Sequence, residues 1–158
     1  MNINPLVGGK APSKFLKGFA GYLQTDAYQG YNGLTVLETI ISVLCWAHAR
    51  RKFNDIIKMT TGTGGKAQEA IKMIAELYAV EKEARLKGLP PDEIKKLRHK
   101  KSKPILARIK LWLDEHVYRT PPKSPLGEAI RYVLNHWKAL NSYLDDGRLS
   151  IDNNFCEN

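Results

Sequence analysis

The sequence predicts a chain that is mostly α-helical, with two short strands near its start. Residues 21–26 and 39–44 are short segments of strand-forming residues, and apolar residues recur at spacings of three and four from about Trp46 onward. Glycine and proline residues divide this second part into four or five helices. A length of 158 residues is typical of one domain. Because a two-stranded sheet is marginally stable by itself, we expect part of its sheet to be missing from these residues.

The two predicted strands are separated by a loop rich in turn-forming residues. Residues 21–26 form a short strand that ends on the carboxylate of Asp26, and residues 28–33 contain the glycine and asparagine of a turn-rich loop. Residues 39–44 are dense in β-branched side chains and too few for a helix, which favours a buried strand. Before these strands we expect an irregular lead-in and a short helical turn capped by Ser13.

Four helical segments follow the strands. Residues 47–59 and 67–87 form amphipathic helices, separated by a loop that is rich in glycine and threonine. Asp92 lies in the first turn of a third helix, which we expect Pro104 to interrupt. Ser124 caps the last helix, and a proline occupies the first helical position. The core-facing seam of that last helix consists of Leu126, Ile130, Val133, Trp137, Leu140 and Leu144.

The net charge favours a polyanionic partner. Twenty-five Lys and Arg residues against 16 Asp and Glu residues give +9, which points to nucleic acid first and to an acidic membrane surface second. No apolar run approaches the roughly 18 residues of a membrane-spanning helix, and the start of the chain lacks the pattern of a secretory signal. The two cysteines lie far apart and form no disulfide framework, so we expect a reducing cytosolic setting.

Four blocks of sequence contain the residues that suggest a chemistry. They read GYLQTDAYQGY at 21–31, CWAHARRKF at 45–53, RYVLNHW at 131–137, and LDDGRL at 144–149 followed by IDNN and Glu157. In this order, over about residues 5–158, they resemble the insertion-sequence 66 family of DDE transposases. By this resemblance Asp26 corresponds to the second catalytic aspartate of the family and Glu157 to its catalytic glutamate.

The resemblance implies an α/β fold with an RNase H-like core, in which three carboxylates hold two divalent metal ions, Mg²⁺ or Mn²⁺. Two such ions, roughly 3.5–4 Å apart, stabilise both the attacking and the leaving oxygen of an in-line displacement. Carboxylate oxygens are ligands that Mg²⁺ prefers. The resemblance therefore implies an enzyme that cuts DNA at transposon ends and joins the freed 3′-OH to target DNA. Asp26 and Glu157 would be its catalytic residues and metal ligands.

The same resemblance divides the chain into three parts. We expect residues 1–58 to be part of the RNase H-like core, residues 59–123 to be a helical insertion, and residues 124–158 to contain the helix and the segment that lead into Glu157. The first aspartate of the family corresponds to a position before Met1. We therefore expect a truncated fragment that binds metal weakly and performs negligible strand transfer by itself.

DNA is the partner that the resemblance implies, both as transposon ends and as target. An unpaired strand edge invites association, so we also expect self-association or pairing with an intact transposase. The expected location is the bacterial cytoplasm, at the nucleoid when DNA is bound. Two other functions stay open: a non-catalytic basic helical module that binds DNA, and a decayed remnant without a selected role.

Basic side chains gather in two places. Arg50, Arg51 and Lys52 follow the second predicted strand, and the resemblance places them where they would steer the phosphate backbone of DNA. Six of the nine residues in 95–103 are Lys or Arg. A solvated helix face and a sequence-independent contact with phosphates are equally good interpretations of this second run.

Cysteine and histidine do not form the pattern of a zinc site. His48 follows Cys45 at a spacing of three, but a structural zinc ion requires four ligands, and no second pair is present. We therefore interpret Cys45 as a buried apolar residue. Taken without its flanking motif, Asp26 would be a turn residue at a strand end, and Glu157 a solvated terminal acid.

Overall fold

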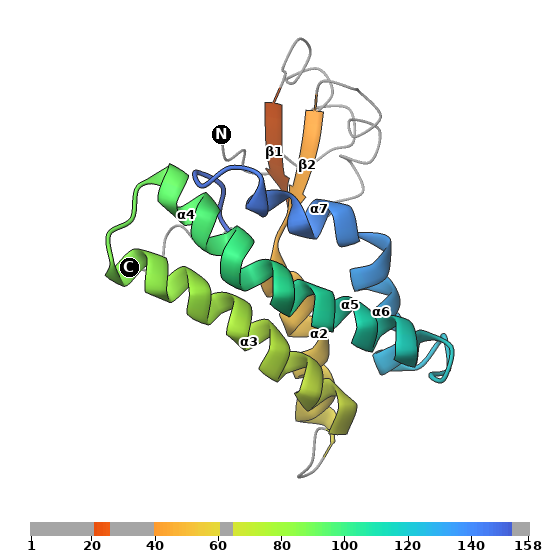
Figure 1. Ribbon diagram of the computed structural model, residues 1–158. Coiled ribbons are helices and arrows are strands. Elements are labelled where there is room, and N and C mark those ends of the chain that lie inside the picture. The colour runs from red at the N-terminus through yellow and green to blue at the C-terminus, as the bar shows by residue number, and fades with distance from the viewer. Residues whose placement is uncertain (1–20, 26–39, 61–64, 153–158) are drawn as a thin grey trace.

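The computed structural model describes residues 21–25, 40–60 and 65–152 of the chain. The prediction of a mostly helical chain with two short strands is confirmed (Figure 1). In chain order the elements are β1 (Gly21–Thr25), β2 (Ile40–Leu44), α2 (Trp46–Met59), α3 (Gly65–Leu86), α4 (Pro91–Leu97), the π-helical turn η2 (Arg98–Ser102), α5 (Lys103–Val117), α6 (Pro125–Asn135), α7 (Trp137–Asn141) and the 3₁₀ turn η3 (Ser142–Leu144).

The two strands pair in parallel, in a register that sets Gly21 opposite Ile40 and Thr25 opposite Leu44. Figure 1 shows them side by side at one end of the molecule, with the helices beyond their C-terminal ends. Because parallel strands end at the same edge of a sheet, the chain leaves β1 and β2 at neighbouring points. We call this edge, formed by Thr25 and Leu44, the carboxyl edge.

Helices α3 and α5 form a helical hairpin that packs against α2 and α6. The turn between α3 and α4 contains Gly88 at a φ of +60°, a backbone conformation that glycine adopts without strain. In Figure 1 the two long helices of this hairpin lie side by side across the lower part of the molecule. The hairpin corresponds to most of the segment that we expected as a helical insertion.

Pro104 does not end the third predicted helix. The chain instead stays helical through α4, η2 and α5, and the N–H of Lys103 donates to the carbonyl of Arg98, five residues back. Pro104 lacks the N–H that would bond to Lys100 in a regular α-helix, and its ring would crowd that carbonyl. A wider π-helical turn just before the proline accommodates both effects.

The last predicted helix is broken, contrary to the single helix that the seam from Leu126 to Leu144 predicts. His136 has φ −111° and ψ 16°, outside the helical region, so α6 ends at Asn135 and α7 begins at Trp137. The ring Nδ1 of His136 lies 2.8 Å from the carbonyl oxygen of Tyr132, so the side chain binds to the preceding turn. The predicted cap of this helix is confirmed, because the Ser124 hydroxyl accepts from the N–H of Gly127 at 3.1 Å.

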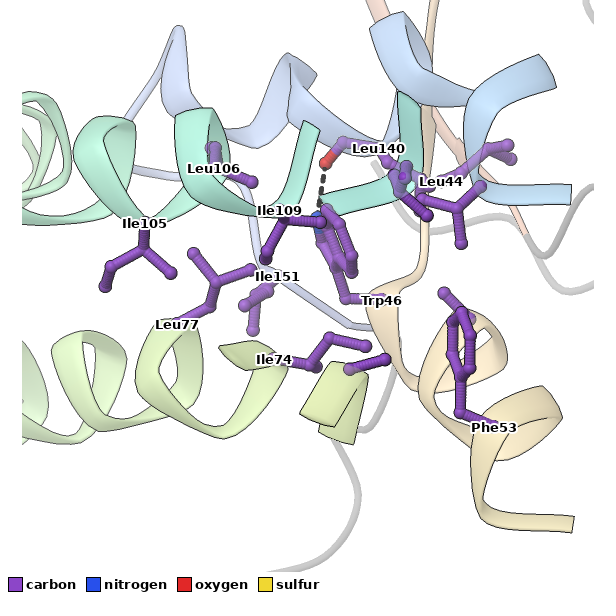
Figure 2. Close-up of a cluster of buried hydrophobic side chains, with 14 of the residues drawn as sticks. Leu44, Trp46, Phe53, Ile74, Leu77, Ile105, Leu106, Ile109, Leu140 and Ile151 are labelled. Carbon is purple, nitrogen blue, oxygen red and sulfur yellow. Dashed lines mark hydrogen bonds between the residues drawn. The ribbon is translucent and has the colours of Figure 1, made fainter. Parts of the chain in front are cut away.

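One continuous apolar core joins β2, α2, the helical hairpin and α6. Trp46 lies at its centre with no exposed surface, and Figure 2 shows its indole among aliphatic side chains from α3, α5 and the C-terminal segment. The indole Nε1–H donates to the carbonyl of Leu140 at 2.9 Å, and the ring of Trp137 packs edge-on against it with centroids 6.1 Å apart. Among the helices described, none is long and apolar enough to cross a membrane.

Candidate functional site at the carboxyl edge

The chain returns to the carboxyl edge at its C-terminal segment. The backbone N–H of Trp46, two residues after the end of β2, donates to the carbonyl of Ile151 at 3.0 Å. Ile151 is buried in the same core as Leu44. Segments that are far apart in sequence, around Thr25, Leu44 and Ile151, therefore meet at one edge of the sheet.

Both candidate acids lie outside the described residues. Asp26 directly follows Thr25, the last residue of β1, and Glu157 comes six positions after Ile151. The structure therefore shows the residues that precede each acid, up to Thr25 and up to Asp152, and not the two carboxylates. Both of these preceding segments lie at the carboxyl edge.

Tyr78 of α3 reaches this edge from the helical hairpin. The guanidinium of Arg50 lies over its ring, with Cζ 4.9 Å from the ring centroid. Burial raises the pKa of the Tyr78 hydroxyl above its ordinary value, and the negative charge of Asp152 raises this pKa further, whereas Arg50 opposes the shift. The Tyr78 phenol therefore stays neutral at physiological pH, between the guanidinium of Arg50 and Asp152, the second residue of the IDNN segment.

The three basic residues after β2 do not share one face of α2. Successive residues of an α-helix are about 100° apart around its axis. Accordingly, Arg50 lies on Tyr78 of α3, whereas the Lys52 ammonium lies 4.7 Å from the ring centroid of Tyr132 on α6. Arg51 lies between them and is exposed. Arg50 is thus the one of the three that faces the segment of Asp152.

The second basic run does not act as a single charged face. Arg98 is only 3% exposed and forms an ion pair with Glu81 of α3. Lys101 is exposed and pairs with Glu83 at 2.6 Å. The other exposed lysines of this run are Lys95, Lys96, Lys100 and Lys103. The interpretation as a uniformly solvated or phosphate-binding run is therefore wrong for Arg98, which belongs to the interior.

Within the part of the chain that the structure describes, no three His, Cys, Asp or Glu residues gather in a way that would hold a metal ion. Cys45 is a buried free thiol, as interpreted from the sequence. The Nδ1 atom of His48 is buried and has no hydrogen-bond partner among the described residues.

Sequence reasoning missed Arg98 and Tyr78 as residues that join separate segments. A signal for Arg98 existed, because Arg98, Ser102, Ile105 and Ile109 follow one another at spacings of four, three and four, which places the arginine on the apolar stripe. Tyr78 lies on the apolar face of its helix. Nothing in the sequence pairs it with Arg50.

The family profile described as "Transposase IS66 family" matches residues 2–158. The chain belongs to the IS66 family of transposases. Its resemblance to this family, seen first in four short blocks, thus extends over essentially the whole sequence. Transposases of this family act on DNA and depend in general on divalent metal ions.

Three relatives of this IS66 chain come from Sinorhizobium fredii. The uncharacterized protein y4qI is 37% identical over 158 residues, which cover 95% of this chain and 28% of the relative. The corresponding values are 34% identity, 90% and 28% for the uncharacterized protein y4jD, and 32%, 94% and 29% for the uncharacterized protein y4hP. The chain therefore spans less than a third of the length of these relatives. No solved structure matches it.

Proposed function

We propose that this chain forms part of the catalytic domain of a DNA transposase, which cleaves phosphodiester bonds and transfers DNA strands with divalent metal ions. One observation supports this most directly. The pairing of Thr25 with Leu44 and the hydrogen bond from Trp46 to Ile151 bring the segments that enter both candidate acids to the same edge of a parallel sheet.

Asp26 and Glu157 are the proposed metal ligands and catalytic residues. Carboxylate oxygens are the donors that Mg²⁺ and Mn²⁺ take in such sites. When bound, these ions would stabilise the negative charge on the attacking and leaving oxygens of the phosphodiester. The role of the chain itself is to hold the two carboxylates at the carboxyl edge, where β1 ends and where Ile151 begins the IDNN segment.

Arg50 and Arg51 are the proposed contacts to the phosphate backbone. Arg50 is fixed against the ring of Tyr78 and faces the segment of Asp152, whereas Arg51 is exposed beside it. An arginine presents its donors in a rigid planar fork that matches a phosphate group. Lys52 lies against Tyr132 of α6, on another side of the helix, and would contact a more distant part of the duplex.

We propose that the 158 residues alone perform negligible strand transfer. They contain two of the three carboxylates that a DDE site needs, and they span less than a third of the curated relatives. Among the described residues, β1 pairs with β2 alone, and its other edge is open to a further strand. Self-association, or pairing with an intact transposase, would fill that edge, and size-exclusion chromatography would contradict this by showing a clean monomer.

Paramagnetic broadening by Mn²⁺ tests the proposed metal ligands. In the NMR spectrum of this chain, millimolar Mn²⁺ should broaden the amide signals of Thr25 and Asp152. Asp26→Asn and Glu157→Gln should each weaken that broadening, whereas the control Asp55→Asn, an exposed acid of α2, should leave it unchanged. Unchanged broadening in both acid variants would show that Asp26 and Glu157 bind no metal.

Salt-dependent binding to a short DNA duplex tests the proposed contacts. The logarithm of affinity should fall linearly with the logarithm of salt concentration, and Arg51→Gln should reduce the slope by about 1. Lys110→Gln is the control, because Lys110 pairs with Asp114 on α5 at 2.7 Å. If Arg51→Gln and Lys110→Gln had the same slope of affinity against salt, a contact between Arg51 and the DNA phosphates would be excluded. If the chain binds DNA but Asp26→Asn and Glu157→Gln leave the Mn²⁺ broadening unchanged, the alternative function as a non-catalytic DNA-binding module is favoured.

A further inference from the structure

Arg98 is a buried arginine whose donors are all used. The Nε–H of Arg98 donates to one carboxylate oxygen of Glu81 at 2.9 Å, and an Nη2–H donates to the other at 2.8 Å. Its remaining donors bind three backbone carbonyls, those of Tyr143 at 2.7 Å, Asp146 at 3.1 Å and Leu149 at 2.8 Å. A guanidinium has five N–H donors, so each of them has an acceptor here. We call this arrangement of Arg98, Glu81 and the three carbonyls the Arg98 clamp.

The clamp joins two parts of the molecule that are far apart in sequence. Glu81 and Arg98 belong to α3 and η2 of the helical hairpin, whereas the three carbonyls belong to one short segment, residues 143–149, which we call the turn. The Arg98 guanidinium also lies over the ring of Tyr143, with Cζ 4.9 Å from the centroid. Because a buried charge is costly unless it is paired and hydrogen-bonded, the guanidinium strongly favours the arrangement in which that turn is docked.

Two further contacts dock the same turn on the hairpin. The ring Nε2 of His99 lies 3.2 Å from the carbonyl oxygen of Leu144. The backbone of Gly147 packs so closely on Pro91 that a Cβ at this position would collide with the Pro91 carbonyl oxygen. The turn is therefore held on its carbonyl side by Arg98 and at its tip by α4.

The docked turn leads directly to the carboxyl edge. Leu149 is the last residue whose carbonyl binds Arg98. Ile151 follows two positions later, and its carbonyl accepts from the N–H of Trp46. Any loosening of the clamp would be transmitted over two residues to the segment that continues to Glu157.

We infer that Arg98, seated on Glu81, is a positioning residue: through it the helical hairpin fixes residues 149–152, from which the chain continues to Glu157, at the carboxyl edge. This inference rests on the proposed function for the role of Glu157, but not for the clamp itself. The hairpin thereby supports the metal site from a distance, without contributing a ligand. Arg98→Lys tests the fork geometry, because a lysine retains the charge but has three donors in place of five.

Amide hydrogen exchange of the 158-residue chain measures how strongly the clamp protects the docked turn from local opening. In Arg98→Lys, exchange at Trp46 and Leu149 should accelerate at least tenfold more than exchange at Ile74 and Ile109, which lie in the interior of α3 and α5. Local release of the turn gives such a difference, whereas a general loss of stability accelerates all four amides alike. Equal acceleration, or none, would overturn the inference.

Two variants of α3 complete the exchange experiment. Glu81→Gln retains the size of the side chain and one acceptor, so it should reproduce the local effect at Trp46 and Leu149 in weaker form, even if Arg98→Lys fails to fold. Glu83→Gln is the matched control, because Glu83 pairs with Lys101 in an exposed ion pair between the same two parts of the hairpin. It should leave exchange at Trp46 and Leu149 unchanged, and an effect as large as that of Glu81→Gln would overturn the inference.

Mn²⁺ broadening separates the positioning role from the proposed function. In Arg98→Lys, broadening should decrease at Asp152 but persist at Thr25, because only the C-terminal segment is released. Broadening that persists equally at both residues would overturn the positioning role. If the unaltered chain shows no Mn²⁺ broadening at either residue, the proposed metal site is wrong, and the exchange ratios still decide whether the clamp exists.

Discussion

Replacement of Trp46 by phenylalanine tests how the carboxyl edge is held to the helices. The substitution removes the indole N–H that binds Leu140, which leaves a buried carbonyl without its partner at a cost of about 1–3 kcal/mol. It also weakens the edge-on contact with Trp137, worth about 0.5–1.5 kcal/mol. We therefore expect Trp46→Phe to lower the free energy of unfolding by about 2–4 kcal/mol.

Urea unfolding followed by circular dichroism measures this loss, with an unchanged m-value if the denatured state is unaffected. At about 2–4 °C for each kcal/mol in a domain of this size, the melting temperature should fall by about 5–15 °C. Trp112→Phe is the matched control, because its indole donates to the exposed carboxylate of Glu69 at 2.9 Å. The control should cost less than about 1 kcal/mol. Equal costs for the two substitutions would refute the reasoning that burial of the acceptor decides the loss.

Three further predictions concern turns and caps. Gly147→Ala should destabilise the protein by about 1–3 kcal/mol in urea unfolding, because the new methyl group would collide with the backbone of Pro91. Ser124→Ala should cost about 1 kcal/mol in the same assay by removing the cap of α6. The hydrogen bonds from Arg148 lower the pKa of Asp146 to about 2, so this carboxylate stabilises the fold above its unfolded pKa, and that contribution should be lost as the pH falls from about 4 to about 2. The melting temperature of Asp146→Asn should accordingly depend less on pH in that range.

Local sequence patterns predicted the elements whose formation depends on residues that are close together in the sequence. The β-branched residues at 39–44 gave a strand, observed as Ile40–Leu44, and the repeat of apolar residues from Ala67 gave the helix observed as Gly65–Leu86. The cap at Ser124 was also predictable, because a hydroxyl before a proline satisfies a free N–H within three residues.

Features that depend on distant partners were not predictable in this way. The seam from Leu126 to Leu144 follows helical spacing throughout, but the helix breaks at His136, whose ring binds Tyr132. The sequence of the basic run does not show that Arg98 is buried, because its partner Glu81 lies on another helix. A spacing rule describes one helix at a time, whereas these features arise from contacts between elements.

The candidate site was predicted through resemblance rather than through geometry. The structure adds that the segments entering Asp26 and Glu157 meet at one edge, through the pairs Thr25–Leu44 and Trp46–Ile151. No pattern in the sequence could show the second pair, because a backbone hydrogen bond between residues so far apart depends on the packing of the whole core.

The π-helical turn makes the hairpin sensitive to chain length. It contains one more residue than an ordinary helical turn would, between α4 and α5. Deleting Lys100 would restore regular helical winding, and the ring of Pro104 would then crowd the carbonyl four residues before it. Homologous proteins that keep this proline should therefore tolerate changes of residue type in the turn far more readily than the deletion of a residue from it.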